Sequence, residues 1–389
     1  MRKSIYSIFI LSTIFSQLIQ AKIVQEELIP PVIEAKSYIL MDYDTKRILI
    51  SKNADEKLPP ASLTKLMTSY VTSVKINSGE ISLKDKAFIS KKAWKMTGSR
   101  TFLNVNTKVD LSTLVKGMII QSGNDAVVAI AEHISGSEKA FVKLMNQYAK
   151  QLGLNNTHYS DATGLPVNNH YSTAQDIALL SRAIIKDFPD HYEWYSMKNF
   201  KYNNISQNNR NTLLWKDPSV DGLKTGHTNA AGYCLASSAK RKDMRLIAVV
   251  MGTKSSKARA VESEKLLNYG FKYYDTHKLY KANTVIKKSK IWEGEKEEVS
   301  LGLEKDLAVT IVRSKDKQLQ TIINIKKPII AAVNKGQELG TVEVHLDDKI
   351  LITVPLIALN TINKGNLWDQ MIDSITLWIK TNIPYDTNF

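Results

Sequence analysis

Ser62 and Lys65 are two residues whose types and spacing could perform nucleophilic chemistry. Ser62 opens a run with apolar residues at helical spacing, which predicts a helix buried on one side. On that helix Lys65 lies one turn away, and a lysine that is denied full solvation could accept the serine proton. The same Ser-x-x-Lys spacing occurs twice more in this lysine-rich chain, and serine is also a common N-cap. The pair therefore needs support from elsewhere in the sequence.

A second candidate pair, Ser122 and Asn124, lies between two predicted helices. The first helix is expected from Leu111 to Gln121, and the second begins at Ala126. A hydroxyl and an amide at such a break could face a cleft and hold a substrate. Serine, glycine and asparagine are also the usual residues of an ordinary turn, so the pattern alone leaves both interpretations open.

The third candidate is Lys224-Thr225-Gly226, a tripeptide that occurs once in the chain. On the edge of a strand, the lysine would offer a fixed positive charge to a carboxylate, and the threonine would add a hydroxyl donor. The glycine would let a substrate backbone or ring approach the strand closely. The alternative is the exposed end of a surface strand, which the tripeptide alone does not exclude.

Composition narrows the class of partner. The chain has 389 residues, 43% of them hydrophobic, which is enough for two or three domains with proper cores. The net charge of +15 suits an anionic partner, but the basic residues form no long run, which argues against nucleic acid. The single cysteine, Cys234, lies in an apolar stretch and is expected to be buried. No His-Glu-x-x-His or Cys-His cluster occurs, so neither a metal nor another cofactor is expected.

The chain divides into four segments. Residues 1–21 have a charged start, an apolar stretch and a small residue before Lys22, which predicts a secretory signal. Residues 30–276 mix helical runs with strands at both ends, which predicts one α/β unit whose terminal strands share a sheet. The helical period then disappears, and residues 281–359 are expected to form a small all-β domain. Residues 363–382 predict an amphipathic helix.

Within the α/β unit, alternation on both sides of a polar turn predicts a hairpin over residues 36–51. Residues 203–211 are rich in asparagine and are expected to form a loop. Strands are expected at residues 233–238 and 245–251, and a helix over residues 261–274 should close the unit.

The tail helix has Trp368, Trp378 and several other apolar residues on one face and polar residues on the other. This pattern favours a helix in a membrane interface, and the helix is too polar to span the bilayer. Asp369 and Asp373 weaken that interpretation, because anionic lipid would repel them. The alternatives are a terminal helix docked on the protein and a dimer contact.

Together and in this order, the three motifs are far more specific than any one of them. The chain resembles the low-molecular-mass penicillin-binding proteins, in particular the D-alanyl-D-alanine carboxypeptidases of the penicillin-binding protein 5 type. The resemblance runs nearly end to end and includes the β domain and the amphipathic tail. The stretches that carry it are Pro60-Ala61-Ser62-Leu63-Thr64-Lys65, Gln121-Ser122-Gly123-Asn124-Asp125-Ala126, Asn209-Arg210-Asn211, Val220-Asp221-Gly222-Leu223-Lys224-Thr225-Gly226-His227-Thr228 and Glu262-Ser263.

The resemblance implies a penicillin-binding/β-lactamase-like transpeptidase domain of the α/β (α+β) class. It implies that Ser62 is the acylated nucleophile and Lys65 its general base. Ser122 and Asn124 would relay protons and orient the substrate.

The resemblance also implies how a substrate would be bound. Lys224 and Thr225 would hold its terminal carboxylate, with Gly226 allowing close approach. Arg259 matches a family arginine near that carboxylate, and Arg210 matches another arginine beside the cleft. The backbone N–H groups of Ser62 and His227 would form the oxyanion hole.

The implied reaction removes the terminal D-alanine from a peptidoglycan stem pentapeptide through an acyl-enzyme that water resolves. β-Lactam antibiotics are expected to acylate the same serine. The exported enzyme is expected at the periplasmic face of the bacterial inner membrane, held there by its tail helix.

Two alternatives remain, a class A β-lactamase and a catalytically idle wall-binding scaffold. Class A β-lactamases use a Glu-x-x-x-Asn loop between the second and third motifs. The only such match here, Glu264 to Asn268, follows Lys224 and lies inside a predicted helix. The intact Ser62 and Lys65 argue against an idle scaffold.

Overall fold

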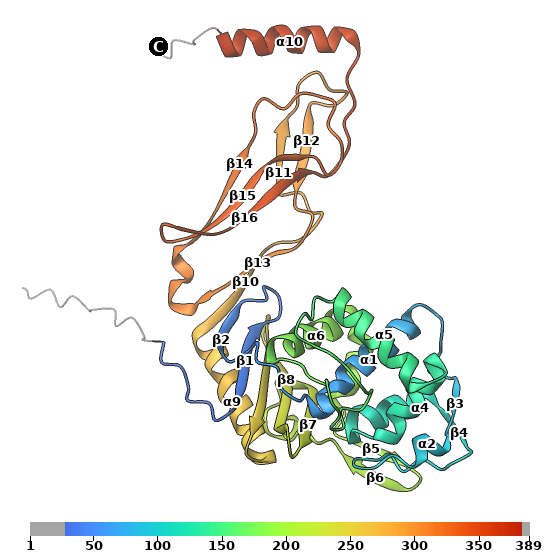
Figure 1. The fold of residues 1–389 in the computed structure, drawn as a ribbon. Helices are drawn as coiled ribbons and strands as arrows, with labels where there is room; N and C mark the ends of the chain where they lie inside the picture. Colours follow the sequence, from blue (N-terminus) through green and yellow to red (C-terminus); the bar gives the residue numbers. More distant parts are fainter. Residues whose placement is uncertain (1–27, 383–389) are drawn as a thin grey trace, which may run out of the picture.

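The structure is a computed structural model that describes residues 28–382, so the secretory signal expected at residues 1–21 lies outside the described residues. Figure 1 shows two domains arranged in line, with a helix across the far end of the second domain. The first domain contains a five-stranded antiparallel sheet in the order β2-β1-β9-β8-β7. Its strands are β1 (Ser37–Asp42), β2 (Ile48–Lys52), β7 (Val220–Thr228), β8 (Gly232–Arg241) and β9 (Met244–Thr253).

The sheet confirms two predictions. The hairpin over residues 36–51 forms as β1 and β2, and β1 pairs with β9, so strands from both ends of the unit share one sheet. Alternate side chains of β9 face two different cores, as the strand period of two requires. Ile247 and Val249 face a large core beneath the helical lobe, whereas Leu246 and Ala248 face a smaller core beneath α9 (Ser256–Tyr273).

The chain between β2 and β7 forms the helical lobe, which Figure 1 shows on the opposite side of the sheet from α9. Residues buried at helical spacing on α1, such as Leu66, Met67 and Val71, join it to the large core. Its helices are α1 (Lys65–Asn77), α2 (Lys91–Trp94), α3 (Leu111–Lys116), α4 (Asn124–Ser135), α5 (Glu138–Gln151), α6 (Ala174–Asp187), α7 (Pro189–Tyr192) and α8 (Leu213–Lys216), and its short strands are β3 (Lys86–Phe88), β4 (Lys108–Asp110), β5 (Asn199–Tyr202) and β6 (Ile205–Asn208).

The prediction of a loop over residues 203–211 is partly wrong, because β6 lies in this range and pairs with β5 as a hairpin. Asn203 and Asn204 form its turn with φ values of 46° and 60°. Asparagine tolerates this left-handed conformation, so the asparagines make the turn between two strands and do not mark a long loop.

The second domain confirms the predicted small all-β fold. A two-stranded ribbon of β10 (Tyr274–Tyr280) and β13 (Leu307–Val312) connects the first domain to a five-stranded antiparallel sheet in the order β11-β12-β16-β15-β14. Buried residues such as Val299, Val342 and Leu356 form its core. The sheet strands are β11 (Lys287–Lys290), β12 (Glu298–Gly302), β14 (Leu319–Ile325), β15 (Glu338–Leu346) and β16 (Lys349–Ala358).

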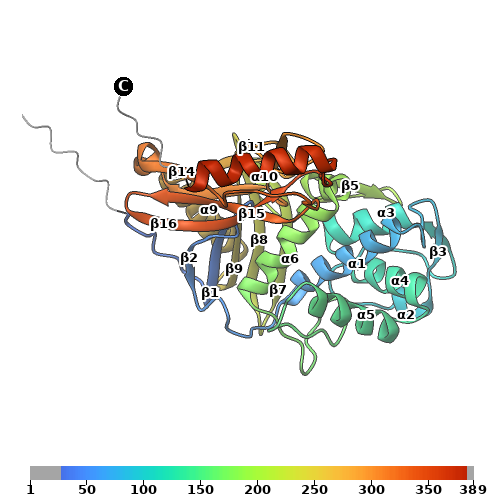
Figure 2. The same cartoon turned by 90° about the horizontal axis from the view of Figure 1, so that it is seen from above.

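The predicted tail helix is α10 (Leu367–Asn382), and Figure 2 shows it lying across the end of the β domain. It contacts the β domain through Asp373, whose Oδ2 accepts the Glu293 N–H at 2.7 Å. Trp368 and Trp378 on its apolar face are mostly exposed. Over residues 28–382, no helix combines the length and apolar character that crossing a membrane requires.

Candidate active site

Ser62 lies on a 3-10 turn (Ala61–Thr64) that runs into α1, where the sequence predicted the first turn of a regular helix. The turn is tight because the Leu63 N–H donates to the Pro60 carbonyl, three residues back. Lys65 begins α1, and its Nζ donates to Ser62 Oγ at 2.8 Å. The spacing therefore brings the two groups into direct contact, as the sequence predicted.

Lys65 is buried, with 1% of its surface exposed, and its ammonium group has three acceptors. Besides Ser62 Oγ, these are Asn124 Oδ1 at 2.7 Å and the Thr163 carbonyl at 2.9 Å. Burial lowers the pKa of Lys65 to about 7, opposed by the negative charge of Asp161. A substantial fraction of Lys65 is therefore neutral near pH 7 and able to accept a proton.

Ser122 and Asn124 lie at a break between helices, as predicted, but the helix before the break is not regular. After α3 the chain forms a π-helical turn (Gly117–Gln121), and Ser122 follows with a left-handed φ of 68°. The Ser122 hydroxyl is buried and makes no hydrogen bond within the described part of the chain. A buried hydroxyl without a partner at a cleft is a natural contact for a substrate atom.

Asn124 also fixes the loop that forms the opposite wall. Its Nδ2 donates to the Thr97 carbonyl at 2.7 Å, and its backbone N–H donates to the Ser99 carbonyl at 2.7 Å. The next residue, Asp125, is fully buried, and its carboxylate accepts the backbone N–H groups of Thr101 and Leu103. The sequence did not predict this support, although the pair Asn124-Asp125 at the start of a helix is its local signal.

The tripeptide Lys224-Thr225-Gly226 lies on a strand, as predicted, and this strand, β7, is one of the two edge strands of the sheet. Gly226 presses against the turn that carries Ser62, because a Cβ there would lie 3.0 Å from the Pro60 carbonyl and 3.3 Å from the Ser62 nitrogen. Only glycine allows this approach without displacing the turn. The edge of β7 and the Ser62 backbone are therefore held side by side.

Lys224 lies on the same face of β7 as Gly226, the face that meets the Ser62 turn. It is buried, its Nζ donates to the Thr225 carbonyl at 3.0 Å, and it does not line the cleft. Burial and the nearby cations Lys65, Arg210 and Arg259 hold the pKa of Lys224 well below its ordinary value.

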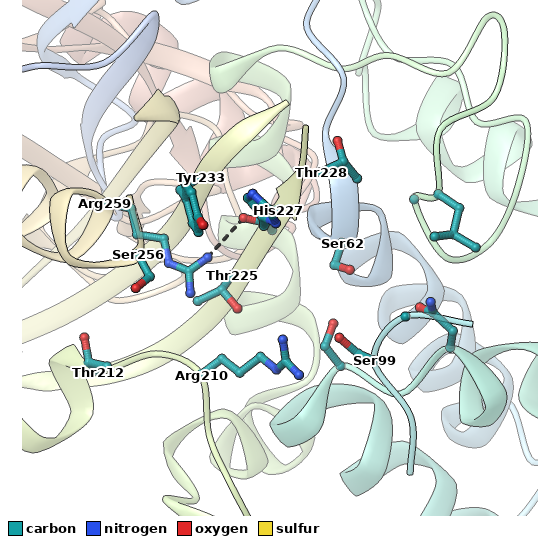
Figure 3. A pocket seen from close by; sticks show the side chains of 16 residues that line it. Ser62, Ser99, Arg210, Thr212, Thr225, His227, Thr228, Tyr233, Ser256 and Arg259 are labelled. Atoms are coloured by element: carbon teal, nitrogen blue, oxygen red, sulfur yellow. Dashed lines mark hydrogen bonds between the residues drawn. The ribbon is translucent and has the colours of Figure 1, made fainter. Parts of the chain in front are cut away.

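The other predicted residues surround a cleft of about 620 Å³. Arg259 is fixed by a hydrogen bond from Nη1 to the Gly226 carbonyl, and it lies over the ring of Tyr233, on which His227 stacks. Figure 3 shows Arg259 and Arg210 extending toward the same space from different elements. The lining residues are Ser62, Gly98, Ser99, Ser122, Asn124, Gly164, Leu165, Arg210, Thr212, Thr225, Gly226, His227, Thr228, Tyr233, Ser256 and Arg259.

No acidic side chain of the described residues lines this cleft, whereas two arginines do. The backbone on both sides of Arg210 is fixed by buried amides, since Asn209 Oδ1 accepts the Asn211 N–H and Asn211 Nδ2 donates to the Gly222 carbonyl. The site thus combines a hydroxyl beside a buried lysine with a positive wall. This arrangement can attack a carbonyl in an anionic substrate.

Comparison with known proteins decides the family. A model of the D-alanyl-D-alanine carboxypeptidase family matches residues 23–255, and the model of the penicillin-binding protein 5 C-terminal domain matches residues 274–364. The chain belongs to the D-alanyl-D-alanine carboxypeptidase family. Its activity is that of a serine-type D-alanyl-D-alanine carboxypeptidase.

The similarity to curated carboxypeptidases covers nearly the whole chain. The carboxypeptidase DacA of Haemophilus influenzae is 41% identical over 380 residues, 96% of each chain. The carboxypeptidase DacC of Escherichia coli is 42% identical over 355 residues, 89% of each chain. The crystal structure of penicillin-binding protein 5 from Haemophilus influenzae has a TM-score of 0.82 and 43% identity, covering 86% of this chain and 99% of that one.

These comparisons also bear on the alternatives. The curated relatives with the highest coverage are carboxypeptidases. The Glu264 to Asn268 segment lies within α9, and neither residue lines the cleft of this carboxypeptidase. It therefore does not supply the loop carboxylate that a class A β-lactamase uses.

Proposed function

We propose that this carboxypeptidase acts by acylation of Ser62, with Lys65 as the general base. The observation that carries the proposal is the contact between Lys65 Nζ and Ser62 Oγ, made by a lysine whose pKa burial lowers to about 7. Neutral Lys65 accepts the Ser62 proton as the hydroxyl oxygen attacks the carbonyl of the D-Ala-D-Ala bond. Asn124 holds the lysine from the other side.

The developing negative charge on the carbonyl oxygen is stabilised by the backbone N–H groups of Ser62 and His227. Two features support this assignment. β7 is an edge strand, so every second N–H faces away from β8, and Gly226 keeps the strand against the Ser62 nitrogen.

The unpartnered Ser122 hydroxyl is suited to pass a proton to the leaving D-alanine nitrogen.

The carboxylate of the terminal D-alanine is recognised by the positive side of the cleft. Thr225 offers a hydroxyl, Arg259 a fixed guanidinium, and Arg210 a second guanidinium beside the same space. Lys224, buried beside Thr225 on the same strand, is proposed to hold the same carboxylate once a substrate occupies the cleft. The substrate is a peptidoglycan stem pentapeptide, and β-lactam antibiotics, which present a carboxylate and a reactive carbonyl, acylate the same serine.

Carboxylate recognition is tested by comparing a pentapeptide that ends in D-Ala-D-Ala with its C-terminal amide. The terminal residue is expected to be released from the amide at least about 100-fold more slowly than from the acid. The amide has no negative charge, so the groups of the cleft that pair with a carboxylate would be left without a partner. The measurement is chromatographic quantification of the released D-alanine or D-alaninamide.

The matched variants are Arg259→Gln and Arg241→Gln. Arg241 lies on β8, pairs with Asp217, and does not line the cleft. Arg259→Gln should reduce the difference between acid and amide, and Arg241→Gln should leave it unchanged. Equal release from both peptides by the parent enzyme would refute carboxylate recognition in this cleft.

The carboxypeptidase is further proposed to be exported and to work at the periplasmic face of the inner membrane. The charged and apolar start of the chain supports export. The exposed apolar face of α10 supports a peripheral membrane contact. Asp373 does not oppose that contact, because its carboxylate is bonded to the Glu293 backbone on the side of the β domain.

Membrane binding is expected to depend on the two tail tryptophans. The double variant Trp368→Glu/Trp378→Glu should reduce binding to phosphatidylglycerol-containing vesicles by at least about tenfold, because the apolar area that enters the interface is lost. Release of D-alanine from a soluble pentapeptide should be unchanged. Vesicle co-sedimentation measures the first quantity.

The control replaces Ile322 and Ile350, two exposed apolar residues of the β domain outside α10, with glutamate. Vesicle binding should stay at the parent level in this control. Full binding by the tryptophan variant would assign α10 to a docked helix or a dimer contact.

A further inference from the structure

A single peptide unit connects a carboxylate to the buried lysine. The Thr163 carbonyl accepts a hydrogen bond from Lys65 Nζ at 2.9 Å. On the other edge of the same peptide, the Gly164 N–H donates to Asp161 Oδ1 at 2.6 Å. The C=O and N–H of a planar trans peptide point in opposite directions, so the carboxylate that fixes the N–H also fixes the carbonyl aimed at Lys65.

Asp161 closes this turn with several bonds. Its Oδ1 accepts the Thr163 N–H at 2.6 Å and the Thr163 hydroxyl at 3.1 Å, in addition to the Gly164 N–H. An aspartate that accepts the N–H two residues ahead stabilises a turn. The orientation of the Thr163–Gly164 peptide therefore depends on one side chain.

The turn is also pressed against the segment that carries Ser62. Gly164 has a φ of +84°, and a Cβ there would lie 1.8 Å from the Ala61 carbonyl oxygen. One turn after Lys65, Thr68 Oγ1 donates to the Ala162 carbonyl at 2.8 Å. Asp161 therefore supports the Ser62 segment from about 100 residues away, although its own side chain does not line the cleft.

We propose that Asp161 is a positioning residue for the carboxypeptidase reaction, which holds Lys65 through the Thr163–Gly164 peptide and sets the pH at which the lysine becomes a base. The proposal rests on the role assigned to Lys65 above. The negative charge of Asp161 next to the Gly164 N–H polarises the Thr163–Gly164 peptide and makes its carbonyl a stronger acceptor. The stronger acceptor stabilises the ammonium form of Lys65. Among the neighbouring charges that raise the pKa of Lys65, Asp161 contributes most.

The other charged groups around Lys65 come from different elements. Asp125, at the start of α4, favours the ammonium form, and Arg210 opposes it. Lys65 and Lys224 on β7 repel each other. His170 borders the same turn, with Nε2 2.8 Å from Thr64 Oγ1, and burial lowers the pKa of its imidazole. Asp161 differs from all of these groups because it acts along a hydrogen-bonded peptide that ends on Lys65 Nζ.

The test separates the charge of Asp161 from its hydrogen bonds. Asp161→Asn keeps an oxygen acceptor for the turn and removes the charge, whereas Asp161→Ala removes both. Acylation rates with benzylpenicillin are measured for the full-length enzyme from about pH 5 to about pH 9. The parent rate should rise with pH to a plateau with a midpoint about pH 7. In Asp161→Asn that midpoint should fall by about one pH unit, because the negative charge that stabilises the ammonium form of Lys65 is lost.

The three variants have distinct expected profiles. Near about pH 6, Asp161→Asn should retain a larger fraction of its own plateau rate than the parent does. Asp161→Ala should lose rate at every pH, because the carbonyl is no longer held toward Lys65. The matched control is Asp176→Asn, whose carboxylate fixes Asn156 and Thr157 in the same connection between α5 and α6. Its midpoint should equal that of the parent.

Two results would overturn the proposal, and they differ. A uniform loss of rate in Asp161→Asn with an unmoved midpoint would leave Asp161 as a structural turn residue, with the role of Lys65 intact. A parent profile without an inflection about pH 7, or one that Lys65→Arg reproduces, would remove Lys65 as the base and the Asp161 proposal with it.

Discussion

A Ser62→Ala variant is expected to gain no mass when it is incubated with benzylpenicillin, whereas the parent enzyme gains the mass of one penicillin. The hydroxyl of Ser62 is the one that lies 2.8 Å from the lysine able to accept its proton. Without it, D-alanine release should fall by at least about 10⁴-fold, since the remaining groups only bind and polarise the substrate. Intact-mass spectrometry measures the adduct, and chromatography measures the release.

The control is Ser99→Ala. Ser99 also lines the cleft, and Figure 3 shows its side chain across the cleft from Arg259. It has no described bond to Lys65, so this variant should form the adduct. An adduct on Ser62→Ala would contradict the assignment, and mapping the modified peptide would identify the true nucleophile.

The parts of the site that the sequence predicted are those governed by local geometry. A spacing of three residues places Lys65 one turn from Ser62, even though Ser62 lies on a 3-10 turn before α1. The placement of Lys224-Thr225-Gly226 on a strand was also predicted, whereas the position of that strand at the edge of the sheet required the structure. The pairing of β1 with β9 was predictable from strands at both ends of a helical segment.

The parts that the sequence did not predict are contacts made by backbone atoms of distant segments. The third acceptor of Lys65 is the carbonyl of Thr163, and a carbonyl has no residue type that a motif can reveal. The sequence from Asp161 to Gly164 indicates a turn around this carbonyl, but it does not indicate which distant segment the turn contacts. The sequence likewise did not predict the π-helical turn before Ser122 or the left-handed conformation of Ser122 that follows it.

Lys224 shows a third limit. The sequence predicted a lysine at a strand edge that binds a carboxylate, but it did not predict that this lysine is buried, with 2% of its surface exposed. Strand alternation assigns Lys224 and Gly226 to one face, but the sequence does not say which face meets the helical lobe. The close contact of Gly226 with the Ser62 turn decides that question, and it required the structure.

Lys65→Arg is expected to lower the rate of acylation by benzylpenicillin by at least about 1,000-fold at every pH from about 6 to about 9. The substitution keeps the positive charge, but a guanidinium does not release its proton in this range and cannot take one from Ser62. The parent rate should rise about tenfold per pH unit below its midpoint of about 7, because only the neutral lysine is a base. The variant should lack that inflection. Stopped-flow measurement with a chromogenic β-lactam gives both profiles.

The matched control for this loss is Lys75→Arg on the same helix, where Lys75 pairs with Glu80 at 2.6 Å and lies far from the cleft lining. Its rate and midpoint should match the parent. If Lys65→Arg retained a tenth or more of the parent rate with the same midpoint, the base would have to be another group. The buried imidazole of His170, which contacts Thr64 beside Lys65, would then be the first to replace. Loss of both rate and inflection in Lys65→Arg alone would connect the pH dependence of the enzyme to one buried amine.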